Sequence, residues 1–331
     1  MMITRCTCNI PLVLLALLCT PGCDVGDQGH AQYTQPPLTP DIRLQQVVPE
    51  DRFDQFLRHF EARESHIASA RHVIQDNYPN VDDTTYQFLC IATSRRAQGK
   101  ATYTSRLLLF LYGAASQGHL GTVQFIRDQG VAMDQPDEEG LTPLHMAATN
   151  GHLHIVQYLT GIGIQPDVFS HQNWSPLHSA AHNGHLAVVQ HLQAIGAQVD
   201  TYNQLGWSPL HSAVERGHVA IVEYLIVVGA AVNTVNKHGV TPMHSAAYKG
   251  YLEIMQLLRE AGAYIDNPDQ DGSTPLWMAA QRGHVCAVNY LKNAGAQIDT
   301  PDKYAVTPLW IAEHNGCLAV ARYLRRQGTR M

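Results

Sequence analysis

A repeat of 33 residues constrains the fold of this chain more than any other feature of the sequence. The dipeptide Thr142-Pro143 recurs at this spacing as Ser175-Pro176, Ser208-Pro209, Thr241-Pro242, Thr274-Pro275 and Thr307-Pro308. One glycine series keeps the same spacing at Gly118, Gly151, Gly184, Gly217, Gly250, Gly283 and Gly316. Another does so at Gly130, Gly163, Gly196, Gly229, Gly262, Gly295 and Gly328. Because three markers stay in register, we expect a solenoid of small units that bury a core only by stacking.

Each marker predicts a local structure. A Ser or Thr before Pro is typical of a helix start, because the hydroxyl accepts a backbone N–H and Pro suits the first helical position. A glycine of the first series is expected to end that helix in a left-handed conformation. Apolar spacing, as at Val188, Val189 and Leu192, then predicts a second helix that ends at the second glycine series. Polar segments such as Asp269–Gly272 predict turns between the units.

This pattern of turn, helix and helix resembles the ankyrin repeat. Thr-Pro-Leu-His is complete at Thr142–His145, Ser-Pro-Leu-His follows at 175 and 208, and Thr-Pro-Met-His stands at 241. Trp277 and Trp310 replace the histidine in the last two units, and the first unit lacks the Thr-Pro start. The resemblance implies an all-α ankyrin-repeat solenoid with hairpin turns over about residues 104–331. Its expected units are 104–136, 137–169, 170–202, 203–235, 236–268, 269–301 and 302–331.

The first 23 residues have the pattern of a secretory signal. Arg5 precedes the apolar run Ile10–Cys19, and Pro21-Gly22 follows it. The run is shorter than the roughly 20 residues that a membrane-spanning helix needs. Thr20–Cys23 resembles a bacterial lipobox with Cys23 as the lipidated residue, although Thr20 stands where Leu is expected. We therefore expect an exported or lipid-anchored protein, the alternative being a cytoplasmic protein whose first 23 residues are not a signal.

Two further segments precede the repeats. Residues 24–48 combine Gly, Pro, Gln and Thr without periodicity, which predicts a flexible tether. Residues 49–103 show helical spacing of apolar residues, for example at Phe53, Phe56, Leu57 and Phe60. We expect this helical region to cover the open end of the solenoid, the alternative being a separate partner-binding helix.

The sequence offers little support for catalysis or for nucleic-acid binding. The net charge is −6 and charged residues make up 15% of the chain, so the basic footprint that phosphate binding requires is missing. Sequence motifs for a nucleophile elbow, a zincin or a dinucleotide site do not occur. Gly99–Thr102 resembles the end of a phosphate loop, but Ser94 replaces its leading glycine, which favours an ordinary loop. We expect no enzyme activity and no cofactor.

Histidines are frequent, but most of them follow the repeat. His145, His178, His211 and His244 belong to the Thr-Pro-Leu-His motif, and His119, His152, His185, His218 and His284 follow the first glycine series. His178, His182 and His185 are close enough in sequence for zinc, yet no Cys or carboxylate ligand accompanies them. We expect no metal site.

The resemblance implies that a protein partner binds the concave side, on the turn tips and the ends of the first helices. Trp174 and Trp207 precede the helix-start serines of successive units, and we expect them to form an exposed apolar patch. The alternative is that each ring folds back on its own turn. The other expected partner-binding residues are His171, Gln172, His182, Leu205, Glu215, Arg216, Lys237, His238, Tyr248 and Lys249.

The predicted function is a monomeric, non-catalytic module for protein–protein interaction. The alternative is a cytoplasmic scaffold or an enzyme-inhibitory protein whose N-terminal helical region carries a separate activity.

Overall fold

The computed structural model describes residues 100–328, with side chains from Leu107 onward. The predicted signal, the tether, Cys23 and residues 49–99 lie outside this range. Helices make up the regular structure of the described residues, and strands do not occur in them. The helices are α4 Lys100–Gln117, α5 Leu120–Asp128, α6 Pro143–Thr149, α7 Leu153–Gly161, α8 Pro176–Asn183, α9 Leu186–Ala194, α10 Pro209–Arg216, α11 Val219–Val227, α12 Pro242–Lys249, α13 Leu252–Glu260, α14 Pro275–Gln281, α15 Val285–Asn293, α16 Pro308–His314 and α17 Leu318–Arg326.

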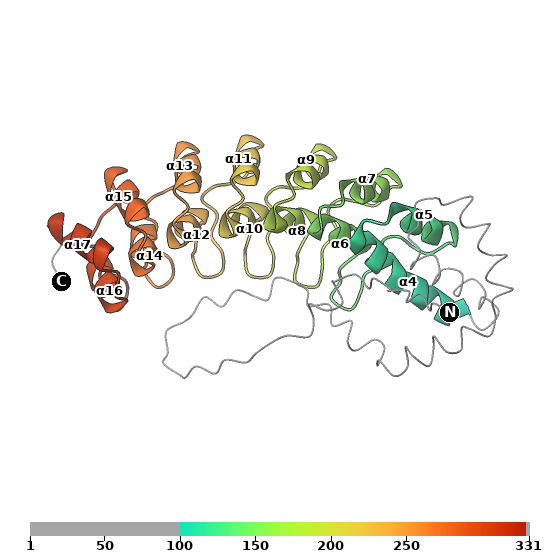
Figure 1. Ribbon diagram of the computed structural model, residues 1–331, viewed down its shortest axis with the longest axis horizontal. Coiled ribbons are helices and arrows are strands. Elements are labelled where there is room, and N and C mark those ends of the chain that lie inside the picture. Colours follow the sequence, from blue (N-terminus) through green and yellow to red (C-terminus); the bar gives the residue numbers. More distant parts are fainter. Residues whose placement is uncertain (1–99, 329–331) are drawn as a thin grey trace, which may run out of the picture. The chain divides into compact units, whose positions relative to one another are not determined.

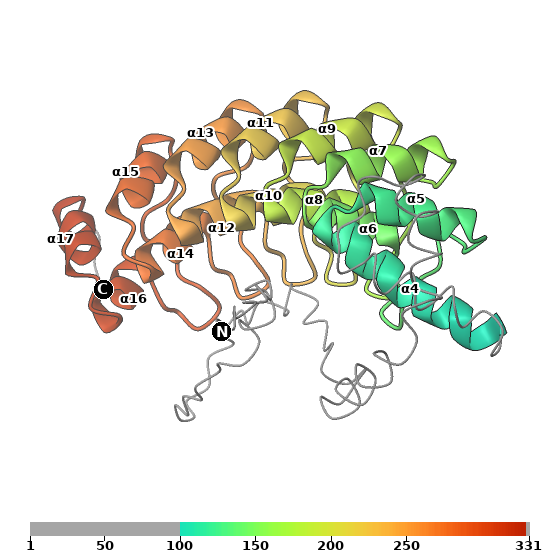
Figure 2. The same ribbon diagram turned by 45° about the vertical axis from the view of Figure 1, so that its right-hand side comes forward.

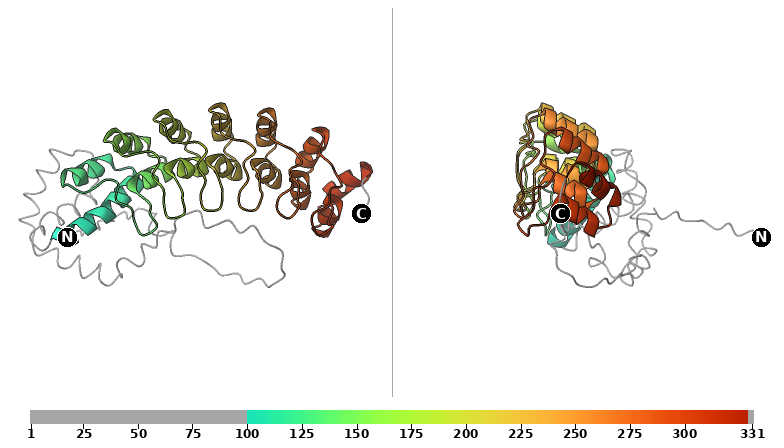
Figure 3. Two further views of the ribbon diagram at one scale, coloured as in Figure 1. Left: turned by 180° about the vertical axis from the view of Figure 1, so that it is seen from behind. Right: turned by 90° about the vertical axis from the view of Figure 1, so that its left-hand side faces the viewer.

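The helices stack in two rows (Figure 1). The even-numbered helices from α4 to α16 form one row, and the odd-numbered helices from α5 to α17 form the other. Figure 2 shows the odd-numbered row on the outer side of a curve, so we call it the outer row and the other the inner row. The turns between units all project to one side, next to the inner row, which is clear when the array is viewed along its length (Figure 3).

The predicted helix starts are confirmed at the level of hydrogen bonds. The Ser175 hydroxyl accepts the backbone N–H of His178 at 3.3 Å, and Pro176 is the first residue of α8. Ser208 and Thr241 cap α10 and α12 in the same way. Each hydroxyl satisfies a donor that a helix N-terminus leaves without an internal partner.

The helix-closing glycines are also confirmed. Gly217 has a φ of +76° and ends α10 in the left-handed conformation. A Cβ built on Gly217 would lie 2.8 Å from the Tyr251 ring of the next unit, which is too close for a real contact. Glycine is therefore required here both by the backbone and by the neighbouring unit.

A single apolar core runs between the two rows. Its fully buried side chains come from both, for example Leu177 and Leu210 from the inner row and Leu192 and Leu225 from the outer row. The alanine pairs at 147–148, 180–181, 246–247 and 279–280 are also fully buried. Small side chains at these positions let neighbouring inner helices approach closely, as the sequence predicts.

The first unit differs from the others in its long helix. α4 spans the expected boundary at residue 104, so the helical region before this position continues into the first unit. The expectation of a loop at Gly99–Thr102 is wrong for Lys100–Thr102, which belong to α4. The missing Thr-Pro pair explains the difference, because nothing in this unit starts a new helix where the other units do.

Candidate functional site

The turns between units form a continuous hydrogen-bonded row. Within one turn, the backbone N–H of Asp269 donates to the carbonyl of Ser273, which closes a tight hairpin. Between turns, the N–H of Gln270 donates to the carbonyl of His238 at 2.9 Å, and the N–H of Lys303 donates to the carbonyl of Asp271 at 2.8 Å. The same bond joins the earlier turns, at His171, Gln204 and Lys237. The turn tips therefore make a connected surface rather than independent loops.

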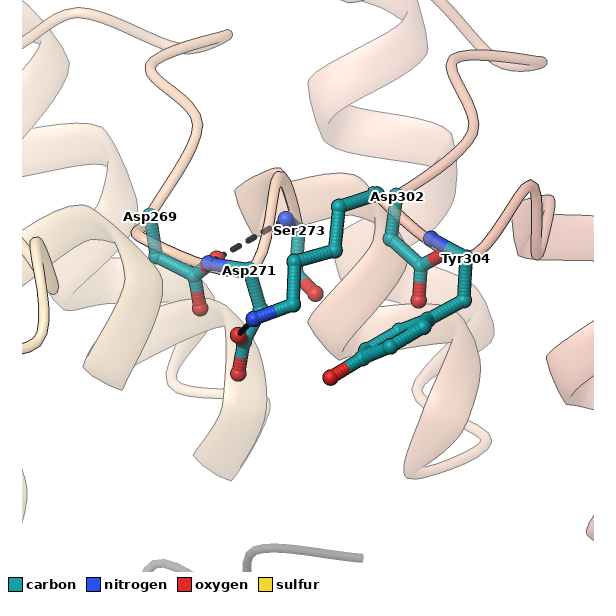
Figure 4. A network of polar contacts seen from close by, with 6 residues as sticks. Asp269, Asp271, Ser273, Asp302 and Tyr304 are labelled. Carbon is teal, nitrogen blue, oxygen red and sulfur yellow. Dashed lines mark hydrogen bonds and ion pairs between the residues drawn. The ribbon is translucent and has the colours of Figure 1, made fainter.

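Side chains add a second set of bonds to this row (Figure 4). The Asp269 carboxylate accepts the backbone N–H groups of Asp271 at 2.9 Å and Ser273 at 2.8 Å. Asp302 accepts the N–H of Tyr304 in the same way, and the Lys303 ammonium pairs with Asp271 of the preceding turn. The first residue of every turn plays this part with its side-chain oxygen, which belongs to Asp137, Ser170, Asn203, Asn236, Asp269 or Asp302. Because each turn is held in this way, the side chains at the tips can vary without loss of the turn.

The motif histidines link each inner helix to the following unit. The Nδ1 atom of His178 accepts the backbone N–H of Ser175, so the proton of the neutral ring must be on Nε2. Nε2 then donates to the carbonyl of Trp207 in the next unit at 2.9 Å. His145, His211 and His244 make the equivalent bonds to Trp174, Val240 and Ser273.

Burial keeps these rings neutral. It lowers the pKa of His145, of His178 and of His211 from 6.5 to about 4, against the opposing effect of the hydrogen bond to a carbonyl. The pKa of His244 is lowered for the same reason. A second proton would sit on Nδ1 and break the bond to the helix cap. The hydrogen bonds of the folded protein therefore require the neutral ring.

Trp277 stands in place of a motif histidine and keeps one of its two hydrogen bonds. Its indole N–H donates to the carbonyl of Val306 at 3.0 Å, in the place of a histidine Nε2–H. Indole has no acceptor nitrogen, so the second bond, to the helix cap, is lost. The substitution of histidine by Trp277 thus keeps the hydrogen bond to the following unit.

The histidines after the glycines link each unit to the preceding one. Nε2 of His185 donates to the carbonyl of Thr149 at 2.9 Å, and His152, His218 and His284 do likewise. His178 and His185, from the cluster considered for zinc, therefore use their Nε2 atoms in bonds to neighbouring units. No group of side chains in residues 107–328 has the arrangement of a metal site.

Trp174 and Trp207 are half-buried rather than fully exposed, because each lies against a histidine of its own unit. The Trp174 ring lies 5.1 Å from the His178 ring, and its N–H donates to the Ser179 hydroxyl at 2.8 Å. The Trp207 ring lies 5.6 Å from the His211 ring. This geometry agrees with the alternative in which each ring folds back, while part of each ring stays accessible.

The other expected binding residues divide into two groups. At the turn tips, His171, Gln172, Lys237 and His238 are exposed and Leu205 is half-buried. At the ends of the inner helices, Arg216 is exposed, Glu215, Tyr248 and Lys249 are half-buried, and His182 is buried.

Sequence reasoning missed a row of exposed apolar residues in the turns. Phe169, Tyr202 and Val235 precede the first turn residue in three successive units, with exposed fractions of 41%, 39% and 51%. The available signal was their common register, since Pro136, Pro268 and Pro301 hold this position in other units. The expected surface concerned only the tips and helix ends, and so it left this row out.

The repeats place the chain in a known family. A family model described as ankyrin repeats (3 copies) matches residues 111–203, 188–269 and 262–331. The chain therefore belongs to the ankyrin repeat family, whose repeats generally act as protein–protein interaction modules and are typically non-catalytic. A comparison with curated proteins finds no match to this chain.

None of the helices between residues 100 and 328 combines the length and the apolar character that crossing a membrane would need.

Proposed function

We propose that the chain is a non-catalytic adaptor that binds a protein partner on the turn tips and the inner-helix ends, with Trp207 as a central anchor. The observation that carries this proposal is the contrast between frame and surface. Glycines, turn-holding side chains and, in most units, histidines fix the frame, while the side chains at the turn tips and the inner-helix ends differ from unit to unit. A constant scaffold with a variable surface is what recognition by a solenoid requires.

Trp207 is a better anchor than Trp174. The indole N–H of Trp174 is used by Ser179, whereas the indole N–H of Trp207 makes no hydrogen bond with the described residues. Trp207 can therefore offer both an apolar ring and a donor, the combination that makes tryptophan common at the centre of interfaces.

Cross-linking in the producing cells tests this proposal. A photoreactive residue at Gln204, exposed at a turn tip, should cross-link the partner, and one at Ala220, exposed on α11 of the outer row, should not. Trp207→Ala should reduce the Gln204 cross-link about thirtyfold, as for a hot-spot residue. Val227→Ala, which removes a 76% exposed side chain from α11, is the matched control and should leave it unchanged.

Equal cross-linking from Gln204 and Ala220 would contradict the proposed surface. An undiminished cross-link in Trp207→Ala would remove Trp207 from it.

A further inference from the structure

Three cations occupy one register position at the ends of successive inner helices. Arg216, Lys249 and Arg282 each stand directly before a helix-closing glycine. Asn150, Asn183 and Asn315 hold this position in the other units that begin with Ser-Pro or Thr-Pro. The row of cations therefore covers three adjacent units in the middle of the array.

Two of these cations are engaged by the residue one unit earlier. The Lys249 ammonium lies 2.6 Å from a carboxylate oxygen of Glu215. The Arg282 guanidinium lies 4.7 Å from the centre of the Tyr248 ring, which is a cation–π contact. In both cases the preceding unit supplies a side chain that offsets the positive charge.

In the same position of the unit before Arg216, where Lys249 has Glu215 and Arg282 has Tyr248, the chain has His182. This residue carries no negative charge. Burial first, and the positive charge of Arg216 second, lower the pKa of His182 to about 4. Arg216 is exposed and forms no hydrogen bond or ion pair with the described residues. Of the three cations, it is the one that no carboxylate or aromatic ring of the preceding unit offsets.

The surroundings of Arg216 include both polar and apolar groups. The His182 ring is only 4% exposed, and its Nδ1 atom has no hydrogen-bond partner among the described residues. The His182 ring also lies edge-on to the half-buried Trp174 ring, with centroids 6.0 Å apart. His182 in the last turn of α8 is thus near enough to Arg216 at the end of α10 to feel its charge, and it adjoins Trp174, which precedes α8. We call these three residues the Arg216 corner.

We propose that the Arg216 corner binds an acidic side chain of the partner, Asp or Glu, whose apolar neighbour packs on Trp174. This inference rests on the proposed function and names the chemistry that the surface selects. A guanidinium can hold a carboxylate by two parallel hydrogen bonds, and nearby protein groups strengthen the attraction by excluding water. The chain has a net charge of −6, so an acidic segment needs a local cation of this kind to bind.

A library of random short peptides, panned against the full chain, tests the inference without knowledge of the partner. The selected peptides should be enriched in Asp or Glu beside an aromatic or aliphatic residue. A synthetic peptide of the selected sequence should bind Arg216→Gln about tenfold more weakly than the native chain. Arg216→Lys keeps the charge without the paired geometry, so its affinity should lie between the two.

Two controls separate this site from a general effect of charge or folding. Arg259→Gln removes the same charge from an exposed position on α13 of the outer row and should bind like the native chain. Replacing the acidic residue of the peptide by its amide should weaken binding to the native chain about tenfold and hardly affect Arg216→Gln. The measurement on the native chain changes the peptide alone, so this part of the comparison holds even if a variant of the chain folds poorly.

Peptides without acidic enrichment, unchanged affinity in Arg216→Gln, or the absence of any selected peptide would each overturn the inference. Peptides that depend on Trp207 but not on Arg216 would overturn it while leaving the proposed function in place.

Discussion

At the residue scale, glycine is needed for different reasons in the two glycine series. Gly217 has a φ of +76° and a neighbouring ring within 2.8 Å of any Cβ, whereas Gly229 has a φ of +95° and nothing within 4 Å. The first position therefore combines backbone strain with a close contact, and the second has strain alone. Asn173 and Ala305 show that other residues can adopt positive φ in the turns.

Alanine at each of these two glycines separates the two effects. Gly229→Ala should cost about 1 to 2 kcal/mol of unfolding free energy, the strain of a left-handed residue with a Cβ. Gly217→Ala should cost about 1 to 3 kcal/mol more, because the Tyr251 ring has to move. Chemical denaturation of the two variants measures the difference. Equal losses would show that Tyr251 yields without cost.

At the element scale, the histidines join the units in both directions. His178 donates forward to the unit of Trp207, and His185 donates back to the unit of Thr149. Stability thus depends on rings that are neutral and hydrogen-bonded, since a buried group without its partner costs more than the bond contributes.

This arrangement predicts that acid destabilises the array. In the unfolded chain His145, His178 and His211 bind protons below about pH 6.5, but in the folded chain they stay neutral down to about pH 4. Protons therefore favour the unfolded state between these two values. The contribution of these neutral rings to the free energy of unfolding is fully present above pH 6.5. It falls by about 3 kcal/mol for each ring as the pH approaches 4.

Denaturant titrations at a series of pH values measure this loss. The unfolding free energy should be nearly constant above pH 7 and decline steeply between pH 6.5 and 4. His178→Ala should show a shallower decline, because one of the rings that resist protonation is gone. A curve that stays flat to pH 4 would contradict the neutral-ring interpretation.

The sequence predicts the elements well because their causes are local. Ser175 and Pro176 start a helix through bonds within one turn, and the conformation of Gly217 is a property of a single residue. The half-burial of Trp174 could not be predicted, since it depends on how the ring turns toward His178 and Ser179. The isolation of Arg216 likewise depends on which side chain the preceding unit brings to it.

At the scale of the whole molecule, a stacked array has no centre at which chemistry could concentrate. Each inner helix packs on the helices before and after it in its row and on the outer helix of its own unit. What many units share is consequently an extended surface. Because each unit contacts only its neighbours, a change at one turn tip leaves distant units intact. This separation of frame from surface is the reason why the corner at Arg216 and the anchor at Trp207 can be tested by single substitutions.

We expect residues 1–23, which lie outside the described range, to decide where the whole molecule resides. We propose that the chain is exported and anchored through Cys23, because an apolar run ends shortly before Thr20–Cys23, which resembles a lipobox. The native chain should then partition into the membrane fraction, and Cys23→Ser should move it to the soluble fraction. Cys19→Ser, a matched change inside the predicted signal, should leave partitioning unchanged.

A native chain that is already soluble, or Cys23→Ser protein that remains in the membrane fraction, would refute the lipid anchor. Sequencing the mature N-terminus distinguishes these cases, since lipidation requires Cys23 to be its first residue.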